Sequence, residues 1–373
     1  MFHNSKRYIG IFLVVLLFSM LTVSTANAEE IENTYENENT YVEEQNQSVV
    51  SSESIIVLND YMKNGYFLEA SDFNIKSERE VFDINGRNIA KYYVVESLNG
   101  QEYFAIISNT QENSAVLLGG EGNGDVFELG DENYYYFGGY SIVSADDTNQ
   151  IIEYIKSEDE DLSTYEIIQD LDIQLMNPKA STGDGYGSKL LSSPIFSQMD
   201  PDVKSGYRNS ACGPTTMAVI LQYWHDSKGK SKLYVWNSGY TTKGAFINNM
   251  YANRGGAFYG MSVNGVRSGL ENEAIARGYA ASSSSFNNFY SYKTQIDDNR
   301  PVAVKFDKWF SKWEPNAKYD YDYHWTPGLG YIYTAASGTL LRVQTLSENS
   351  SLKDINYDAN SGIITMVSFS INN

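Results

Sequence analysis

The chain is poor in the residues that build metal sites and disulfide frameworks. Its 373 residues include one cysteine and three histidines. A single cysteine cannot form an internal disulfide, and structural zinc sites need several His or Cys ligands at short spacings. A calcium loop needs more carboxylates than the pair Asp320 and Asp322 supplies. These shortages predict no metal site and no disulfide scaffold.

Positive charge is scarce as well. Lys and Arg together number 27 against 47 Asp and Glu, which gives a formal net charge of −20 at pH 7. No glycine-rich loop precedes a lysine in the pattern that cradles nucleotide phosphates. A surplus of negative charge repels phosphate backbones and anionic headgroups, so we expect neither nucleic acid nor an anionic membrane surface as a partner.

Long apolar runs are limited to one, at residues 9–23. It follows the basic pair Lys6-Arg7 and precedes the small-residue sequence Ala26-Asn27-Ala28. This arrangement predicts a secretory signal peptide over residues 1–28, and the alternative is a membrane anchor that is never cut. The mature protein is then secreted, either extracellular or associated with the cell wall, with no membrane partner. An unpaired thiol in an oxidising compartment is a liability unless it is buried or used in chemistry.

The rest of the chain divides by composition. Residues 29–50 are acidic and polar without any Lys or Arg, which predicts a disordered lead-in. Residues 51–176 hold enough apolar material for an α+β domain with an antiparallel sheet, and residues 190–373 hold enough for a second domain. Between them, residues 177–189 are small, polar and glycine-rich, which predicts an exposed linker that is easily cut.

Hydrophobic periodicity predicts the elements of both parts. Asn99-Gly100 between two apolar runs is a hairpin signal. In the first part we expect strands at residues 91–96, 102–108, 114–118 and 134–143, and helices at 148–157 and 164–176. In the second part we expect helices after residue 212 and over 262–280, and strands at 302–306, 328–333, 339–346 and 362–371.

The single cysteine, Cys212, lies where a loop turns into an apolar helix. Pro214 is favoured in the first turn of a helix, because its missing N–H would have no partner there. The unpaired N–H groups and the positive dipole end at a helix N-terminus favour a thiolate, which is the nucleophilic form. The alternative is a small buried apolar residue without chemistry. Because a side chain at a helix entrance carries little packing, we expect its replacement to leave the fold intact.

A base for this thiol is found among the three histidines. His3 lies in the predicted signal, and His225 lies thirteen residues beyond Cys212 on the same predicted helix, about 20 Å away. Thiol and imidazole must come within hydrogen-bond reach, so His225 is excluded. If the chain is a cysteine enzyme with a histidine base, the pair is Cys212 and His324.

Two motifs resemble those of the papain-like cysteine peptidases. The first is Ala-Cys-Gly-Pro-Thr-Thr at residues 211–216 followed by a helix, and the second runs from His324 to Gly330-Tyr331. The Pro-led strand at residues 301–306 also fits. Over roughly residues 190–345 the chain is most similar to bacterial secreted enzymes of the streptopain-like and bacteriocin-leader-processing types.

The resemblance implies a fold, a mechanism and partners. The fold is α+β with two lobes, a helical lobe that carries the nucleophile Cys212 and an antiparallel β lobe that carries His324. Gln198 stands where the family has its oxyanion-hole glutamine, and no cofactor is needed. The substrate is a peptide or protein. Residues 51–176 correspond to a smaller α+β pro-domain, which would inhibit the zymogen, although an unrelated binding module is the alternative.

The sequence departs from the family at the residue that orients the histidine. The family has Asn or Asp about sixteen residues further on, where this chain has Leu340. A longer hairpin moves the position to Gln344 or Thr345, with Glu348 and Asn349 in the next turn, or leaves the third residue absent. The alternatives to a peptidase are an amidase or acyltransferase acting on cell-wall peptides, and a catalytically inert binding or adhesion module.

Overall fold

The computed structural model describes most of the chain after residue 52. The described residues are 53–109, 114–124, 126–128, 130, 133–136, 142–157, 186–258, 260–307, 324–347 and 350–372. The predicted signal, the acidic lead-in and the predicted helix at 164–176 lie outside them. Residues 50–373 form one unit by their contacts, separate from residues 1–49. No helix among the described residues is long and apolar enough to cross a membrane.

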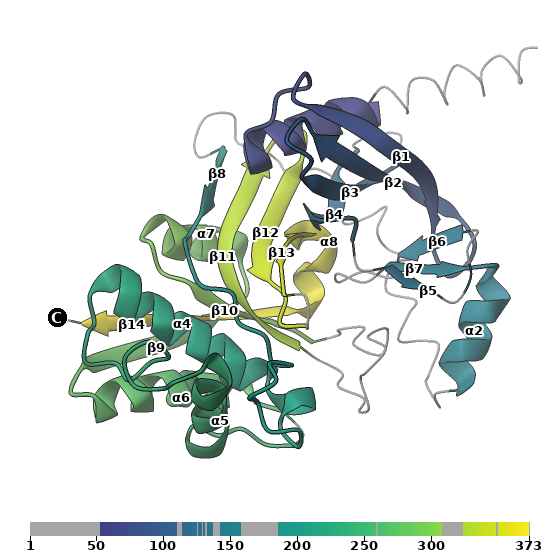
Figure 1. Cartoon of the computed structure of the whole chain (residues 1–373). Coiled ribbons are helices and arrows are strands. Elements are labelled where there is room, and N and C mark those ends of the chain that lie inside the picture. Colours follow the sequence, from purple (N-terminus) through teal and green to yellow (C-terminus); the bar gives the residue numbers. More distant parts are fainter. Residues whose placement is uncertain are drawn as a thin grey trace, which may run out of the picture. The chain divides into compact units, whose positions relative to one another are not determined.

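The C-terminal part is built on an antiparallel sheet (Figure 1). Its strands lie in the order β13-β12-β11-β10-β14-β9, and β8 pairs with β11 outside this path. Their bounds are β8 Gly187–Leu190, β9 Ala280–Phe286, β10 Val302–Phe306, β11 His324–Thr334, β12 Gly338–Gln344, β13 Leu352–Asn356 and β14 Ile364–Asn372. The last three residues of the predicted linker, 187–189, therefore belong to a paired strand.

Several helices of this part begin at polar capping residues. Side chains of Thr242, Ser262 and Asn288 accept a hydrogen bond from the backbone N–H three residues on, which satisfies a donor that the helix leaves free. The helices are η2 Arg208–Ser210, α4 Cys212–Lys228, α5 Lys243–Asn253, α6 Val263–Ala276, α7 Phe289–Asp297, α8 Tyr357–Asn360 and η4 Ser361–Ile363. The predicted helix over 262–280 is confirmed over a shorter range, as α6.

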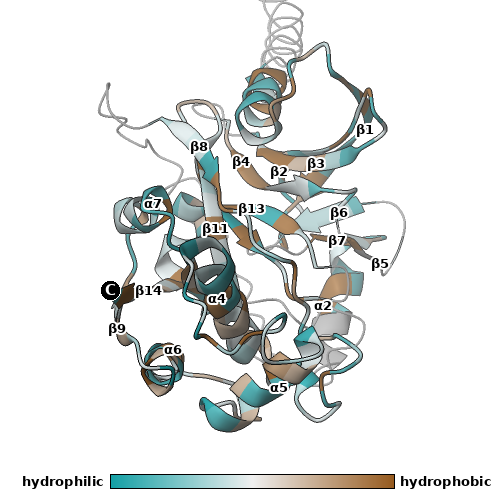
Figure 2. Cartoon of the chain, turned by 60° about the vertical axis from the view of Figure 1, so that its left-hand side comes forward, coloured by the Kyte–Doolittle hydropathy of each residue, from teal (hydrophilic) through white to brown (hydrophobic). Residues whose placement is uncertain are grey.

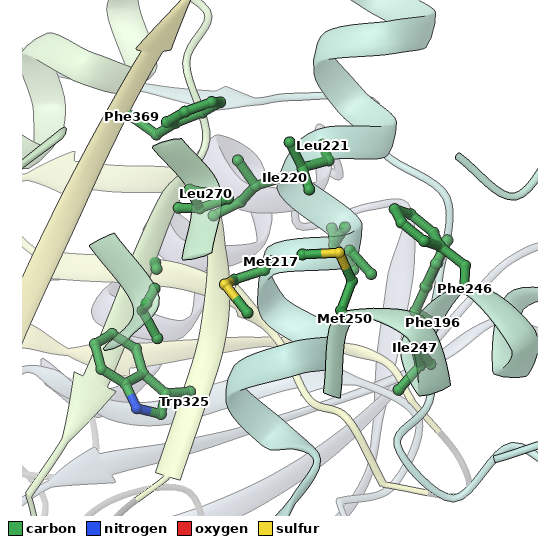
Figure 3. Packing of buried hydrophobic residues seen from close by; sticks show 14 of the residues in the cluster. Phe196, Met217, Ile220, Leu221, Phe246, Ile247, Met250, Leu270, Trp325 and Phe369 are labelled. Atoms are coloured by element: carbon green, nitrogen blue, oxygen red, sulfur yellow. The ribbon is translucent and has the colours of Figure 1, made fainter. Parts of the chain in front are cut away.

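Helix α4 is the centre of the helical layer. Every residue from Cys212 to Trp224 is buried, because the helix is apolar on all sides and has other elements around it. Figure 3 shows Met217, Ile220 and Leu221 of α4 within the apolar cluster that also holds Leu270 and Phe369. The helix ends at Gly229, whose φ of 65° is the left-handed cap that glycine adopts without strain.

Among its described residues, the upstream part carries its own strands and two helices. A helix covers residues 53–66, and α2 covers Thr148–Ser157. The strands are β1 Phe73–Phe82, β2 Asn88–Ser97, β3 Glu102–Ser108, β4 Val116–Glu121, β5 Val126–Glu128, β6 Asn133–Tyr136 and β7 Ile142–Ala145. The hairpin prediction is confirmed, with Gly100 at φ 82° between β2 and β3. The single strand predicted at 134–143 is wrong, because β6 and β7 are separate strands that pair antiparallel.

One sheet runs through both parts of the chain. Strand β4 pairs antiparallel with β13, with Gly119 opposite Asp354 and Leu118 opposite Ile355. Figure 2 colours β3 and β4 as largely apolar, and residues of both strands are buried in core clusters that also contain residues of β11 and β12. The core is therefore shared across the boundary that composition alone suggests.

Candidate active site

Cys212 is the first residue of α4, as the sequence predicts. The turn before it, η2, is tied to α5: the hydroxyls of Ser210 and Tyr251 lie 2.8 Å apart in a buried hydrogen bond. The rings of Tyr251 and Tyr207 stack with centroids 3.9 Å apart. These contacts fix the chain that leads into the helix and so fix the start of α4.

The thiol itself is buried, with 5% of Cys212 exposed, and it belongs to the apolar cluster around α4. The expectation that this side chain carries little packing is therefore wrong. Burial raises the pKa of the Cys212 thiol, and the backbone N–H groups of Trp325, Gly213 and Cys212 offset this only in part, as does the charge of Lys305. The predicted preference for a thiolate is wrong for the resting protein, because desolvation outweighs the helix N-terminus.

His324 is the first residue of β11, and α4 packs against this strand. Its neighbour Trp325 donates its backbone N–H to the thiol, so the start of β11 lies beside the start of α4. Desolvation lowers the pKa of His324 to about 3, because the charged imidazolium is disfavoured where water is scarce, although the residue is half-buried rather than fully covered. The imidazole is thus neutral at neutral pH.

The strand register shows which face of β11 carries the His324 side chain. His324 is opposite Phe306 in the ladder, and Trp325 is opposite Lys305. Successive side chains of a strand point to opposite faces. Trp325 lies in the apolar cluster around α4. The His324 side chain therefore projects from the opposite face of the sheet, at the end of β11. The structure brings the thiol to the backbone beside His324, and the reaction of the two side chains stays a prediction.

His225 lies near the other end of the helix. It is on α4, thirteen residues after Cys212, and its Nδ1 is 2.7 Å from Oδ1 of Asp226. The prediction that both residues share one helix is confirmed, and the argument that distance excludes His225 as the base holds.

Gln198 lies in the loop that follows β8 and is 8% exposed. Its backbone N–H donates to the carbonyl of Leu346 (2.9 Å), which fixes the loop against the segment after β12. Phe196 and Leu346 belong to the same apolar cluster as Cys212. The side-chain Oε1 of Gln198 is buried without a hydrogen-bond partner among the described residues. Such an amide is held in place by its backbone while its polar end stays available.

The structure distinguishes the candidates for the residue that orients His324. Leu340 pairs with Ile332, far along β11 from His324. Thr345 bonds Ser351, accepting from its N–H at 3.0 Å, and so closes a loop. Gln344 is fully buried, and neither its Oε1 nor its Nε2 has a partner among the described residues. Glu348 and Asn349 lie outside the described residues.

Trp325 is a further residue that shapes this site. It is fully buried, its indole N–H donates to the carbonyl of Met261 (2.8 Å), and its backbone N–H reaches the thiol. It therefore joins α4, the start of α6 and β11 at the point where Cys212 lies. The only signal in the sequence is its place directly after His324.

A cysteine at the start of a buried helix, packed on the strand that begins at a histidine, defines the class of papain-like cysteine peptidases. Comparison with family models agrees: residues 190–361 match the model described as the Peptidase_C39 like family. This region is a cysteine peptidase domain of the papain-like superfamily, so the resemblance of the two motifs is confirmed.

Other comparisons add little. A solved structure titled "Crystal structure of UfSP from C.elegans" aligns with a TM-score of 0.30 and 10% sequence identity, covering 51% of this chain and 35% of that chain. Nothing is inferred from so distant a likeness. No curated protein matches the chain.

Proposed function

We propose that the protein is a secreted thiol peptidase, made as a precursor, that hydrolyses peptide bonds through Cys212 and His324. The sulfur attacks the peptide carbonyl carbon, and the imidazole takes the thiol proton and passes it to the leaving amine. Water then attacks the thioester, giving its proton to the imidazole, and the thiol is restored. The observation that carries the proposal is the buried thiol at the start of α4, the helix that packs against the strand beginning at His324.

The protonation states set the order of events. Burial raises the pKa of the Cys212 thiol and lowers the pKa of His324 to about 3, so both groups rest in their neutral forms. The proton therefore moves as the sulfur attacks, rather than before substrate binds. The backbone N–H groups around the sulfur favour the charge that develops on it.

The oxyanion of the tetrahedral intermediate needs fixed donors. In this proposal they are the side-chain amide of Gln198 and the backbone N–H of Cys212. Gln198 is suited to this role because its loop is tied to Leu346 by a backbone hydrogen bond, and its side-chain Nε2 is the group that would donate to the oxyanion. Loss of one oxyanion donor costs on the order of 10²–10³ in turnover in other enzymes.

Gln344 is our candidate for the residue that orients the imidazole. A fully buried amide without hydrogen bonds costs free energy, and such groups are kept where a function needs them. Gln344 ends β12, the strand that pairs with β11. Its amide bonds no described residue, His324 included, so its oxygen would have to turn toward the ring N–H of His324 in order to accept from it and fix the tautomer.

In this proposal residues 1–28 are a secretory signal, and the activity lies outside the cell and acts on peptide or protein substrates. The test is hydrolysis of a denatured protein by the mature form, with Cys212→Ser as the control and a thiol alkylator as a second control. We expect hydrolysis that both the substitution and the alkylator abolish. Hydrolysis that survives both would refute the proposal.

A second candidate, an inert secreted binding module, is favoured by one observation. The thiol is buried and its pKa is raised, as for a structural cysteine. If the module is inert, the folded protein will hydrolyse nothing, and Cys212 will react with an alkylator no faster than an ordinary thiol. Amine or muropeptide acceptors in place of water would instead indicate the acyltransferase or amidase alternative.

A further inference from the structure

The sheet of the peptidase domain contains a buried ion pair away from Cys212. Arg342 on β12 and Asp354 on β13 are opposite each other, with Nε 2.7 Å from Oδ1 and Nη2 2.9 Å from Oδ2. Their side chains are 5% and 0% exposed. Removing two charges from water is costly, and the pair is stable only if the remaining donors and acceptors are also satisfied.

The upstream helix over residues 53–66 supplies those remaining partners. The hydroxyls of Tyr61 and Tyr66 both donate to Oδ2 of Asp354, at 2.8 and 3.0 Å. The carbonyl of Gly65 accepts from Nη1 of Arg342 at 2.9 Å, and the guanidinium lies 4.8 Å from the ring centroid of Tyr66. Without this helix the ion pair loses four contacts and the side chains that cover it.

A second set of polar contacts binds the same helix to the turn between β11 and β12. Oδ2 of Asp60 accepts from the hydroxyls of Thr334 and Ser337, each at 2.5 Å. The hydroxyl of Ser188 on β8 donates to the carbonyl of Asn64 at 2.5 Å. The helix therefore meets four strands of the peptidase sheet, β8, β11, β12 and β13, with specific hydrogen bonds.

The packing at this junction is close. A Cβ on Gly65 would lie 2.8 Å from the Ile332 side chain, and one on Gly119 would lie 2.3 Å from the Tyr61 hydroxyl. Leu58 and Tyr61 are fully buried in one cluster with Ile332. Backbone pairing of β4 with β13 continues the contact along the sheet. A junction with buried charges, shared core and shared strands resembles the interior of one domain rather than a transient interface.

This junction lies far from the candidate active site along the strand. Thr334 ends β11 and His324 begins it. At about 3.3 Å per residue, ten residues separate the two ends by roughly 33 Å. The contacts of helix 53–66 to Thr334 are thus at the opposite end of β11 from His324, and those to Arg342, which is opposite Gly330, lie six residues or roughly 20 Å from it.

We propose that residues 53–157 are a permanent structural partner of the peptidase domain, which stays bound after the chain is cut between residues 158 and 185. The occupant of the surface formed by Arg342, Asp354 and the β11–β12 turn is this upstream segment of the same chain. Its role is to complete the sheet and to satisfy the remaining hydrogen-bonding groups of the buried ion pair. The inference does not depend on the proposed peptidase activity.

The test cuts the full-length protein at a protease recognition sequence placed in the segment 177–185. Gel filtration and thermal unfolding then compare cut and uncut protein. We expect the two fragments to elute together, to separate only in denaturant, and to unfold in one transition. Fragments that separate under native conditions would overturn the proposal, and faster alkylation of Cys212 in the released fragment would identify an inhibitory pro-domain instead.

Two variants of the cut protein locate the contact. Tyr61→Phe combined with Tyr66→Phe removes both donors to Asp354, and should weaken association of the fragments at least tenfold, since each bond is to a charged group. Asp60→Ala removes the separate contacts to Thr334 and Ser337 and leaves the ion pair intact. Tyr290→Phe, on an exposed side chain of α7, is the control. Association unchanged in both variants would refute the docking surface.

Discussion

At the scale of single residues, Cys212 joins two properties that the sequence presents as alternatives. It begins a helix, as a nucleophile of this class does, and it is buried, as a structural cysteine is. Helix position is readable from Pro214 and the apolar run that follows. Burial cannot be read from the local sequence, because it depends on Trp325 and on Met261. Met261 is 49 residues away in sequence and packs against Gly213.

The pH dependence of thiol alkylation follows from this burial. With iodoacetamide, the rate at Cys212 should keep rising above pH 9, because burial raises the pKa of the thiol above its ordinary value of 9.0. His324→Ala should lower the rate but leave the shape of the pH profile unchanged, since the imidazole stays neutral over this range, with a pKa of about 3. A plateau reached below about pH 6 would instead indicate a preformed thiolate–imidazolium pair.

Gln344 allows function and stability to be separated. Gln344→Leu removes a buried amide that has no partner among the described residues, so the protein should become more stable, by about 1–3 kcal/mol, while turnover falls. The matched control is Gln222, also fully buried, whose amide bonds Asp226 and Asn237. Gln222→Leu should lower stability. Urea unfolding and initial rates measure both.

If Gln344→Leu gains stability with full turnover, the residue has no part in orienting His324. The third position would then fall to the segment outside the described residues or be absent.

At the scale of elements, the sequence predicted helices and strands well where apolar residues recur with the period of the element. Helix α2 at 148–157 and strand β10 at 302–306 were predicted with their observed bounds. Strand β9 was missed because its sequence, with four successive serines, has no apolar alternation. It forms by pairing with β14, where Ser282 and Ser370 are 3.0 Å apart and Ser284 and Ser368 are 2.8 Å apart. A strand that forms because it pairs with another strand need not show apolar alternation in its own sequence.

The contact between α4 and α6 gives a prediction at the same scale. A Cβ on Gly269 would lie 2.6 Å from the sulfur of Met217 and 2.9 Å from the carbonyl oxygen of Arg254. Gly269→Ala should therefore destabilise the protein by about 1–3 kcal/mol, as overpacking does. Gly206→Ala, where nothing lies within 4 Å, is the control and should change the unfolding temperature little. Equal unfolding temperatures for both variants would mean that α6 shifts away from α4 without cost.

At the scale of the whole molecule, the sequence predicted two units and the described structure joins both segments through one sheet. Each segment has its own apolar residues, so composition suggests a boundary near the glycine-rich stretch. The pairing of β4 with β13 and the partners of Arg342 are contacts between positions more than 200 residues apart. No local pattern encodes them, which is why the candidate site was easier to predict than the arrangement around it.

Global stability should fall in acid partly through His324. Its pKa is lowered to about 3 from an ordinary 6.5 because the side chain is desolvated. The unfolded chain therefore binds a proton that the folded one does not, and stability is fully present above pH 6.5 and is lost as the pH falls toward 3. His324→Gln, which cannot titrate, should show a smaller loss between these pH values. If thermal unfolding shows the same loss of stability in the unchanged protein and in His324→Gln, then His324 is as solvated in the folded protein as in the unfolded one.

The most direct test of the central claim is labelling of Cys212 by a mixture of peptidyl vinyl sulfones. These reagents need a sulfur nucleophile and a nearby proton donor, as peptide hydrolysis does. Our account predicts that the folded protein is labelled at Cys212 much faster than the denatured chain. It also predicts that His324→Ala slows labelling by about 10²–10⁴-fold, and that His225→Ala has no effect. Labelling of the folded protein no faster than of the denatured chain, or unaffected by His324→Ala, would contradict it.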